Sequence, residues 1–428
     1  MKLSITNPGA TVASILKNSG WLFFDKFARL VLGVTVGAWV ARYLGPAQFG
    51  ELAYAISFIA MFQYIANLGL DGVVVRLLAT STAEAPIILG TVFRLRMLAG
   101  VLGWGTALLA VATLGLGDSG TLSLVAIIGA MLVFQAGDTV DLWFISREQN
   151  QRSVKAKLWA YSVSAAVKVS LVLASAPLTA FAWAVALDFL AVAIAMFFAY
   201  KKYTTASRWR WDTQIGAELL KAGFPFMVAG ISIMIYSRID QLFIGELLGD
   251  AQLGTYAAML PISQLWHVVP MTLLSTVAPY LARLRENDLA EYDAAMVTLC
   301  RLLLFSAIFL SMATALISRP LIEFLYGTHY SAAASVLQTH VFSNVPVFLG
   351  IAQKLWFINE NRGNLAIFVT LLGAIASVSL NQLLIPEYGL HGAAYACVLS
   401  FSISAVFGNL ICAPKLFLMQ IGFKVSSK

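Results

Sequence analysis

Charged side chains that lie inside long apolar stretches are the residues of this chain best suited to chemistry. Asp25 and Arg29 stand four residues apart in the first such stretch, so they share one face of a helix and can pair. Lys168 and Asp188 occupy similar depths in two later stretches. Ionisable groups at membrane depth are costly, and they usually face a partner or a water-filled cavity. These residues are therefore candidates for a polar functional site.

Further charges extend this set. Arg238 and Asp240 are two residues apart in Ser-Arg-Ile-Asp-Gln-Leu, which places them on nearly opposite sides of a helix. At least one of them therefore needs a partner or water elsewhere. Lys26 lies close enough to the end of its stretch for the long side chain to reach the interface. Asp138 lies toward the end of the fourth apolar stretch.

The deep cations predict a polar cavity between the two halves of the protein that accepts an anionic group such as a diphosphate. Arginine offers a planar fork of donors that fits phosphate oxygens and stays charged. A buried carboxyl group favours its protonated form, which would allow acidic residues to couple transport to an ion. Ion pairing for stability alone is the competing interpretation of each residue. The predicted substrate-binding cations are Arg29, Lys168, Arg238 and Lys26, and the predicted ion-coupling residues are Asp25, Asp188, Asp240 and Asp138.

Motifs of enzymatic chemistry are missing from the sequence. It contains no P-loop for nucleotide hydrolysis and no G-x-S-x-G nucleophile elbow. It also has no His, Cys and Asp cluster with metal-ligand spacing, and Cys300, Cys397 and Cys412 stand alone in apolar stretches. We therefore expect a protein that is not an enzyme, with no catalytic residue, no metal and no cofactor.

Composition indicates that these charges belong to a membrane protein. Hydrophobic residues make up 60% of the 428 residues and charged residues 11%, against about 25% charged in ordinary soluble domains. So few charges could not cover the apolar surface of a soluble chain of this length. The net charge of +7 would suit nucleic acid, but the basic residues stand between apolar stretches, where they set membrane orientation. No nucleic acid partner is expected.

The apolar stretches predict an all-α protein with about twelve transmembrane helices, because about 20 apolar residues cross a bilayer as a helix. Lysine and arginine concentrate on one side of this arrangement, which predicts that both termini are cytoplasmic. The spans are expected at 20–44, 49–70, 88–114, 121–145, 154–175, 178–199, 223–246, 252–279, 294–317, 333–357, 364–384 and 390–413. The predicted units are a six-helix lobe (1–199), a cytoplasmic linker (200–222), a second six-helix lobe (223–413) and a cytoplasmic tail (414–428).

An internal repeat supports two similar halves. Leu-Gly-Pro-Ala-Gln-Phe-Gly at 44–50 is echoed by Leu-Gly-Asp-Ala-Gln-Leu-Gly at 248–254, and Leu-Trp-Phe-Ile at 142–145 recurs at 355–358. Gly45 and Gly249 can each end a helix in a conformation that favours glycine. Pro46 suits the first turn of the next helix, and Asp250 can cap it. An even number of spans per half predicts two parallel lobes related by an axis along the membrane normal.

These motifs resemble those of the Wzx-type polysaccharide flippases, which belong to the multidrug/oligosaccharidyl-lipid/polysaccharide exporter (MOP) superfamily. The resemblance implies a multi-pass inner-membrane transporter that moves an undecaprenyl-diphosphate-linked oligosaccharide for O-antigen, capsule or exopolysaccharide synthesis. It implies H⁺ or Na⁺ as coupling ion, and membrane lipids and the polysaccharide polymerase machinery as partners. The motifs that carry it are Ala-Arg-Tyr-Leu-Gly-Pro-Ala-Gln-Phe-Gly at 41–50, Arg-Ile-Asp at 238–240, Leu-Tyr-Gly at 325–327 and Pro-Glu-Tyr-Gly-Leu-His-Gly-Ala-Ala at 386–394.

Two other functional classes compete with the flippase interpretation. An ion-coupled multidrug or small-molecule exporter would share the fold, but a cavity for cationic drugs should be lined by acidic residues. A membrane enzyme such as a polysaccharide polymerase would need a long outer loop with polar residues. The longest outer connection expected, around 318–332, is too short for that purpose.

Overall fold

A computed structural model describes residues 8–80, 84–115, 119–204 and 208–423. These residues form helices and contain no strand. Eleven helical stretches among them are long and apolar enough to cross a membrane. One of the eleven, Phe24–Thr80, contains a turn at Gly45, where the backbone leaves helical geometry (φ 71°, ψ 172°) and the chain reverses, so it crosses twice. The expected all-helical protein with about twelve spans is confirmed.

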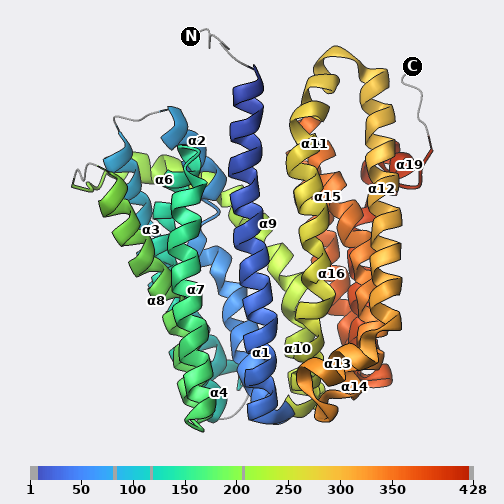
Figure 1. Cartoon of the computed structure of the whole chain (residues 1–428). Coiled ribbons are helices and arrows are strands. Elements are labelled where there is room, and N and C mark those ends of the chain that lie inside the picture. Colours follow the sequence, from blue (N-terminus) through green and yellow to red (C-terminus); the bar gives the residue numbers. More distant parts are fainter. Residues whose placement is uncertain (1–7, 81–83, 116–118, 205–207, 424–428) are drawn as a thin grey trace.

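The helices form two lobes that stand side by side, and the first described helix lies between them (Figure 1). The beginning of this helix and the end of the last one lie at the same end of the bundle. The N-lobe contains α1 (Pro8–Asn67), α2 (Asp71–Thr80), α3 (Ala85–Leu114), α4 (Ser119–Gly129), α5 (Met131–Phe134), η1 (Gln135–Asp138), α6 (Thr139–Ser146), α7 (Asn150–Leu173) and α8 (Leu178–Tyr203).

The C-lobe follows after a short connection. Several of its helices are divided by short turns of tighter or wider helix, including a π-helical turn at Ile403–Phe407. It contains α9 (Thr213–Leu248), α10 (Asp250–Gln264), η2 (Leu265–His267), α11 (Val268–Asn287), α12 (Leu289–Leu316), α13 (Ser318–Tyr326), η3 (Thr328–Tyr330), α14 (Ala332–His340), η4 (Val341–Ser343), α15 (Asn344–Asn359), α16 (Gly363–Tyr388), α17 (Leu390–Ser402), η5 (Ile403–Phe407), α18 (Gly408–Cys412) and α19 (Pro414–Gln420).

The repeated Leu-Gly turns have the predicted geometry. Gly45 and Gly249 both have positive φ, 71° and 85°, which glycine adopts without steric cost. Pro46 follows in the first turn of the next helical segment. Asp250 is the first residue of α10 and not its cap, because Gly249 holds the cap position and no side-chain cap bond is made there. The expected capping role of Asp250 is therefore wrong.

The two copies of the repeat meet each other between the lobes. A Cβ atom on Gly50 would overlap the backbone carbonyl of Asp250, and one on Gly254 would overlap the carbonyl of Pro46. The α1 segment after Gly45 and α10 therefore cross with their backbones in direct contact, which only glycine permits at these two positions. The two repeated segments, 44–50 and 248–254, are therefore in direct contact, so equivalent parts of the two lobes meet each other.

Polar bonds surround this crossing. The Tyr330 hydroxyl donates to the carbonyl of Ala41 at 2.8 Å, and the Arg42 guanidinium donates to the carbonyl of Phe324. Tyr54 and Ser57 of α1 continue the contact, because their hydroxyl groups donate to Glu246 and Gln241 of α9, respectively. We call the Gly50–Gly254 crossing and these bonds the lobe contact. It lies at the end of the bundle opposite the N-terminal end of α1 (Figure 1).

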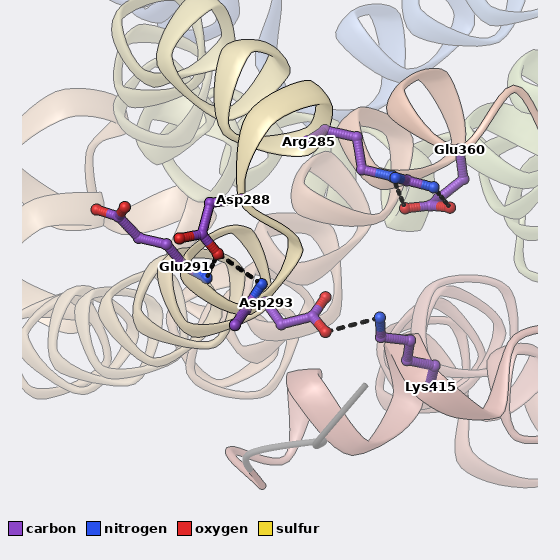
Figure 2. Close-up of polar contacts among 7 residues, drawn as sticks. Arg285, Asp288, Glu291, Asp293, Glu360 and Lys415 are labelled. Carbon is purple, nitrogen blue, oxygen red and sulfur yellow. Dashed lines mark hydrogen bonds and ion pairs between the residues drawn. The ribbon is translucent and has the colours of Figure 1, made fainter. Parts of the chain in front are cut away.

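At the other end of the C-lobe, ion pairs join helix ends (Figure 2). Arg285 at the end of α11 forms a two-bond pair with Glu360 after α15, with distances of 2.7 and 2.9 Å. This pairing raises the pKa of the Arg285 guanidinium. Lys415 of α19 lies 2.7 Å from the carboxylate of Asp293 in α12, whose side chain is 4% exposed. Asp288 caps the start of α12.

Candidate functional site

A cavity of about 740 Å³ lies within the N-lobe, between the two segments of α1 and helices α3, α6, α7 and α8. Its apolar wall includes Val36, Val40 and Leu52, and Phe49 brings it next to the lobe contact. The polar cavity was expected between the lobes, whereas this cavity is lined by N-lobe residues alone. Its lining contains four cations and four carboxylates, which suits a hydrated polar site and not a hydrophobic core. The charged residues that line it are Arg29, Asp71, Arg96, Asp138, Asp141, Lys157, Lys168 and Asp188.

Helix α7 supplies a polar stripe to this cavity. Lys157, Tyr161, Ser164 and Lys168 all line it, and their spacing of four, three and four residues places them on one helix face. We singled out only Lys168 of these from the sequence. The spacing of polar residues within an apolar segment is the signal that could have identified the other three.

Two ion pairs tie this stripe to its neighbours. Lys168 pairs with Asp188 of α8, and the Ser164 hydroxyl donates to the same carboxylate. Lys157 lies 2.5 Å from the carboxylate of Asp141 in α6. The Lys168 and Asp188 side chains are 23% and 29% exposed, so both can also reach the contents of the cavity.

Arg29 carries a charge that the described residues do not pair. Its guanidinium lies 5.4 Å from the ring centroid of Tyr161, a cation–π contact. A cation–π contact does not neutralise the charge of the guanidinium, which can still donate hydrogen bonds to a ligand or water. Arg29 therefore supplies an unneutralised positive charge to the cavity.

Two acidic residues near this cation also lack partners among the described residues. Asp138 lines the cavity from η1 and accepts no hydrogen bond from the described chain. One carboxylate oxygen of Asp25 is buried without a hydrogen-bond partner, and Asp25 lies within electrostatic reach of Lys157 and Arg29. The site therefore offers both a free cation and carboxylates that are not committed to ion pairs.

Arg96 closes the site next to α2. Its side chain is 2% exposed and lies 2.5 Å from the Asp71 carboxylate. It also donates to the side-chain oxygen of Asn67 at 2.5 Å. This arginine is committed to holding α1, α2 and α3 together, and its charge is neutralised.

The predicted site residues thus fall into two groups. Arg29, Lys168, Asp138 and Asp188 line one cavity, and Asp25 lies beside it. The remaining three do not line this cavity: the Lys26 Nζ atom lies 3.8 Å from the sulfur of Met271, while Arg238 and Asp240 belong to α9 of the C-lobe. Within the part of the chain that the structure describes, no group of His, Cys, Asp and Glu could hold a metal ion.

Comparison with known proteins assigns this architecture to a family. A family described as polysaccharide biosynthesis protein matches residues 39–335, which is well over half of the chain. The chain belongs to this family. A shorter similarity connects this family member to a Haloferax volcanii protein named "Probable low-salt glycan biosynthesis flippase Agl15". The two are 23% identical over 188 residues, which cover 42% of this chain and 38% of that protein.

Solved structures show the same fold for this polysaccharide biosynthesis protein. An inward-facing multidrug resistance transporter of the MATE family and MOP superfamily has a TM-score of 0.78 at 13% identity, covering 92% of this chain and 96% of its own. An outward-facing MATE structure has a TM-score of 0.67 at 14% identity, covering 95% and 96%. A MOP-superfamily transporter from Pyrococcus furiosus has a TM-score of 0.65 at 14% identity, covering 95% and 96%.

The family and the fold together confirm the resemblance inferred from the sequence. The chain is a multi-pass membrane protein with the fold of the MOP-superfamily transporters, and it belongs to a polysaccharide biosynthesis family.

Proposed function

We propose that this protein is a flippase that moves an undecaprenyl-diphosphate-linked oligosaccharide across the cytoplasmic membrane for O-antigen, capsule or exopolysaccharide synthesis. The family of polysaccharide biosynthesis proteins and the similarity to a protein named as a glycan biosynthesis flippase support this proposal. The product would be released at the outer leaflet, where a polysaccharide polymerase would use it. Both termini lie on the cytoplasmic side in this arrangement.

The observation that carries the proposal is the unpaired charge of Arg29 in the N-lobe cavity. An anionic diphosphate entering a site of low dielectric needs donors that stay charged, and Arg29 presents them without being held in an ion pair with a described residue. Lys168 lies in the same cavity and is held by Asp188. A diphosphate could therefore be bound by Arg29 first and then attract Lys168 away from its partner. The cavity lining of Tyr161, Ser164 and Gln135 adds neutral polar groups that suit sugar hydroxyls.

Coupling to H⁺ or Na⁺ forms the second part of the proposal. Asp138 is the strongest coupling candidate, because it lines the same cavity and no described residue neutralises it. If Lys168 moves to the substrate, Asp188 becomes a second free carboxylate that can bind an ion. Binding of the anionic substrate would then favour binding of the coupling ion, because it frees the Asp188 carboxylate from Lys168.

Movement of the two lobes would change access to the cavity. The proposed units are residues 1–199 and 223–413, with the linker at 200–222 and the tail at 414–428. The lobe contact holds α1 against α9, α10 and α13 at one end of the bundle. Breaking this contact would open that end, in the manner of alternating access. Lys26, Arg238 and Asp240 do not line the cavity in this conformation. They would contribute to substrate or ion binding in other conformations of the transport cycle.

The decisive experiment uses a deletion strain complemented with variants at matched expression. Polyprenyl-diphosphate-linked sugars are extracted, and surface polysaccharide is measured in parallel. Complete lipid-linked repeat units should accumulate in the deletion strain and in Arg29→Ala, while surface polymer disappears. Arg76→Ala is the matched control, because it removes an exposed cation of α2 that does not line the cavity. Normal surface polymer with Arg29→Ala would refute the cationic site, and unchanged lipid-linked pools in the deletion strain would refute the flippase.

An exporter of cationic small molecules is the second candidate function. The observation in its favour is the pair of uncommitted carboxylates, Asp138 and Asp25, in and beside the cavity. Drug sensitivity of the deletion strain distinguishes the two functions. A strain that becomes sensitive to cationic dyes and retains its surface polymer would favour the exporter.

A further inference from the structure

A buried chain of polar side chains crosses the C-lobe, away from the N-lobe cavity. The Tyr256 hydroxyl donates to the carboxylate of Asp240 at 2.6 Å. The Tyr256 ring stands edge-on to the imidazole of His340, with centroids 5.7 Å apart. The Nδ1 atom of His340 lies 2.8 Å from the hydroxyl of Ser263, whose carbonyl accepts a bond from Asn344 at 3.1 Å. We call these five residues the Asp240–His340 chain.

All members of this chain are buried, with exposures of 5% or less. Buried polar groups stabilise a fold only when every donor and acceptor is paired. Here both ends of the chain are incomplete. The side-chain nitrogen of Gln241, the neighbour of Asp240, is buried without a partner among the described residues, and so is the side-chain oxygen of Asn344. A buried polar atom without a partner needs an explanation, and a proton-binding role would provide one.

The chain has groups that can hold one additional proton. Neutral His340 with a bare Nδ1 accepts the hydroxyl proton of Ser263; as an imidazolium it donates to the same oxygen instead. The Asp240 carboxylate, reached through Tyr256, supplies the opposite charge. Other titratable or charged groups face this region from every packed element, so they belong to the same electrostatic site. They are His267 of η2, Cys397 of α17, Tyr326 of α13 and Arg238 of α9, while α12 presents the uncharged Ser311 and Thr314.

Asp240 is also connected to the N-lobe. The backbone N–H of Gln241 donates to the Asp240 carboxylate at 2.8 Å, and the side-chain oxygen of Gln241 accepts a bond from Ser57 of α1 at 2.7 Å. Tyr256 follows Gly254, the residue of α10 whose backbone touches α1, by two positions. Separation of α1 from both α9 and α10 would therefore break the Ser57–Gln241 bond and admit water to Asp240 and Tyr256.

We propose that the Asp240–His340 chain is a proton-binding site that takes up its proton when the lobe contact opens. In the closed arrangement His340 is 3% exposed, and the neutral imidazole is favoured because a buried charge is costly. Water admitted by opening stabilises the imidazolium beside the Asp240 carboxylate. Linkage is reciprocal, so protonation of this chain favours the open arrangement. The inference rests on the lobe movement of the proposed function, but it does not depend on the substrate.

Nitrogen-15 NMR of histidine tests this proposal directly, because the whole protein contains only four histidines and few signals need to be resolved. The full-length protein is labelled at histidine and held in lipid nanodiscs without substrate. Spectra are recorded between about pH 5 and about pH 9, the range in which histidine normally titrates. His391→Gln assigns one signal and serves as the control, since His391 contacts Tyr395 outside the buried chain. His329, which is exposed, provides a solvent-accessible reference signal in the same sample.

Two variants open the lobe contact by different means. Gly50→Ala introduces a steric overlap with α10, and Ser57→Ala removes the bond to Gln241 without adding atoms. We expect His340 to remain neutral over most of this range in the unmodified protein. In either opening variant its titration midpoint should rise by about one unit or more, a tenfold change in proton affinity. Addition of Asp240→Asn should lower that midpoint by a similar amount, because the negative partner is lost.

The outcome separates this inference from the flippase proposal. A His340 signal that stays neutral in the unmodified protein and in both opening variants would overturn it. So would a midpoint that Asp240→Asn leaves unchanged. Neither result involves lipid-linked sugar, so failure here leaves the assays of substrate translocation unaffected.

Discussion

Replacement of Gly50 by alanine should separate the two lobes at their point of closest approach. The added Cβ would overlap the carbonyl of Asp250 and crowd the backbone nitrogen of Gly254. These are backbone atoms of α10, so no side-chain rotation can relieve the overlap. The helices must move apart, or the closed arrangement must accept the strain.

The magnitude follows from the cost of forcing extra atoms into a packed contact, which is about 1–3 kcal/mol. This cost falls on the closed arrangement alone, because an open lobe contact leaves room for the methyl group. A difference of that size changes the ratio of open to closed molecules by about 5- to 150-fold. Gly254→Ala should act in the same direction, since its Cβ would overlap the carbonyl of Pro46.

Distances between spin labels would measure this shift. Trp39 of α1 and Phe324 of α13 flank the contact and are 54% and 79% exposed, so cysteines placed there can be labelled. The three native cysteines would first be replaced by serine. We expect Gly50→Ala to move the distance distribution toward longer values in nanodiscs at neutral pH.

Gly37→Ala is the matched control. It adds the same methyl group to α1, but a Cβ at this position would meet no atom within 4 Å. The reasoning fails if Gly50→Ala gives the same distance distribution as Gly37→Ala and the unmodified protein. In that case the close approach of α1 and α10 would not control the relative position of the lobes.

Three further predictions concern single charges. Asp138→Asn should preserve expression and substrate binding while removing the pH or Na⁺ dependence of transport in proteoliposomes; dependence equal to that of the unmodified protein would contradict its coupling role. Lys168→Ala should lower thermal stability more than the double variant Lys168→Ala/Asp188→Ala does, because the single variant leaves Asp188 without its partner. The coupling free energy between the two substitutions should be about 0.5–3 kcal/mol, the range for residues in direct contact. Strictly additive effects of the two substitutions on stability would show that the ion pair contributes nothing. Lys415→Ala should destabilise the protein by more than about 1 kcal/mol, the upper range for exposed ion pairs, because it leaves the buried carboxylate of Asp293 unpaired. Arg285→Ala, which breaks a more exposed pair (Figure 2), is the comparison for that thermal unfolding measurement.

The positions of the charged residues in the apolar segments made part of the site predictable. Arg29, Lys168, Asp188 and Asp138 were recognised because a charge at membrane depth needs a reason to be there. Lys157 is not among the predicted site residues, because it lies only three residues inside the expected span at 154–175. In the structure α7 begins at Asn150, so Lys157 lies two turns inside the helix and pairs with Asp141.

The pairing of charges could not be predicted in this way. Asp25 and Arg29 are correctly spaced to pair along α1, yet the structure places Arg29 against Tyr161 of α7. Local spacing states only which residues are able to meet. The choice between a partner on the same helix and one on a neighbouring helix depends on how the helices pack.

The sequence by itself determined the membrane environment, the number of spans and the duplication, because hydropathy and repeated turns are local properties of the chain. Tertiary structure alone decided that the two repeated turns face each other, that Arg29 has no ion-pair partner while Lys168 is paired, and that Asp240 is joined to His340. These relations connect residues tens to hundreds of positions apart. They are set by the packing of whole helices, where one small residue such as Gly50 decides how closely two backbones approach.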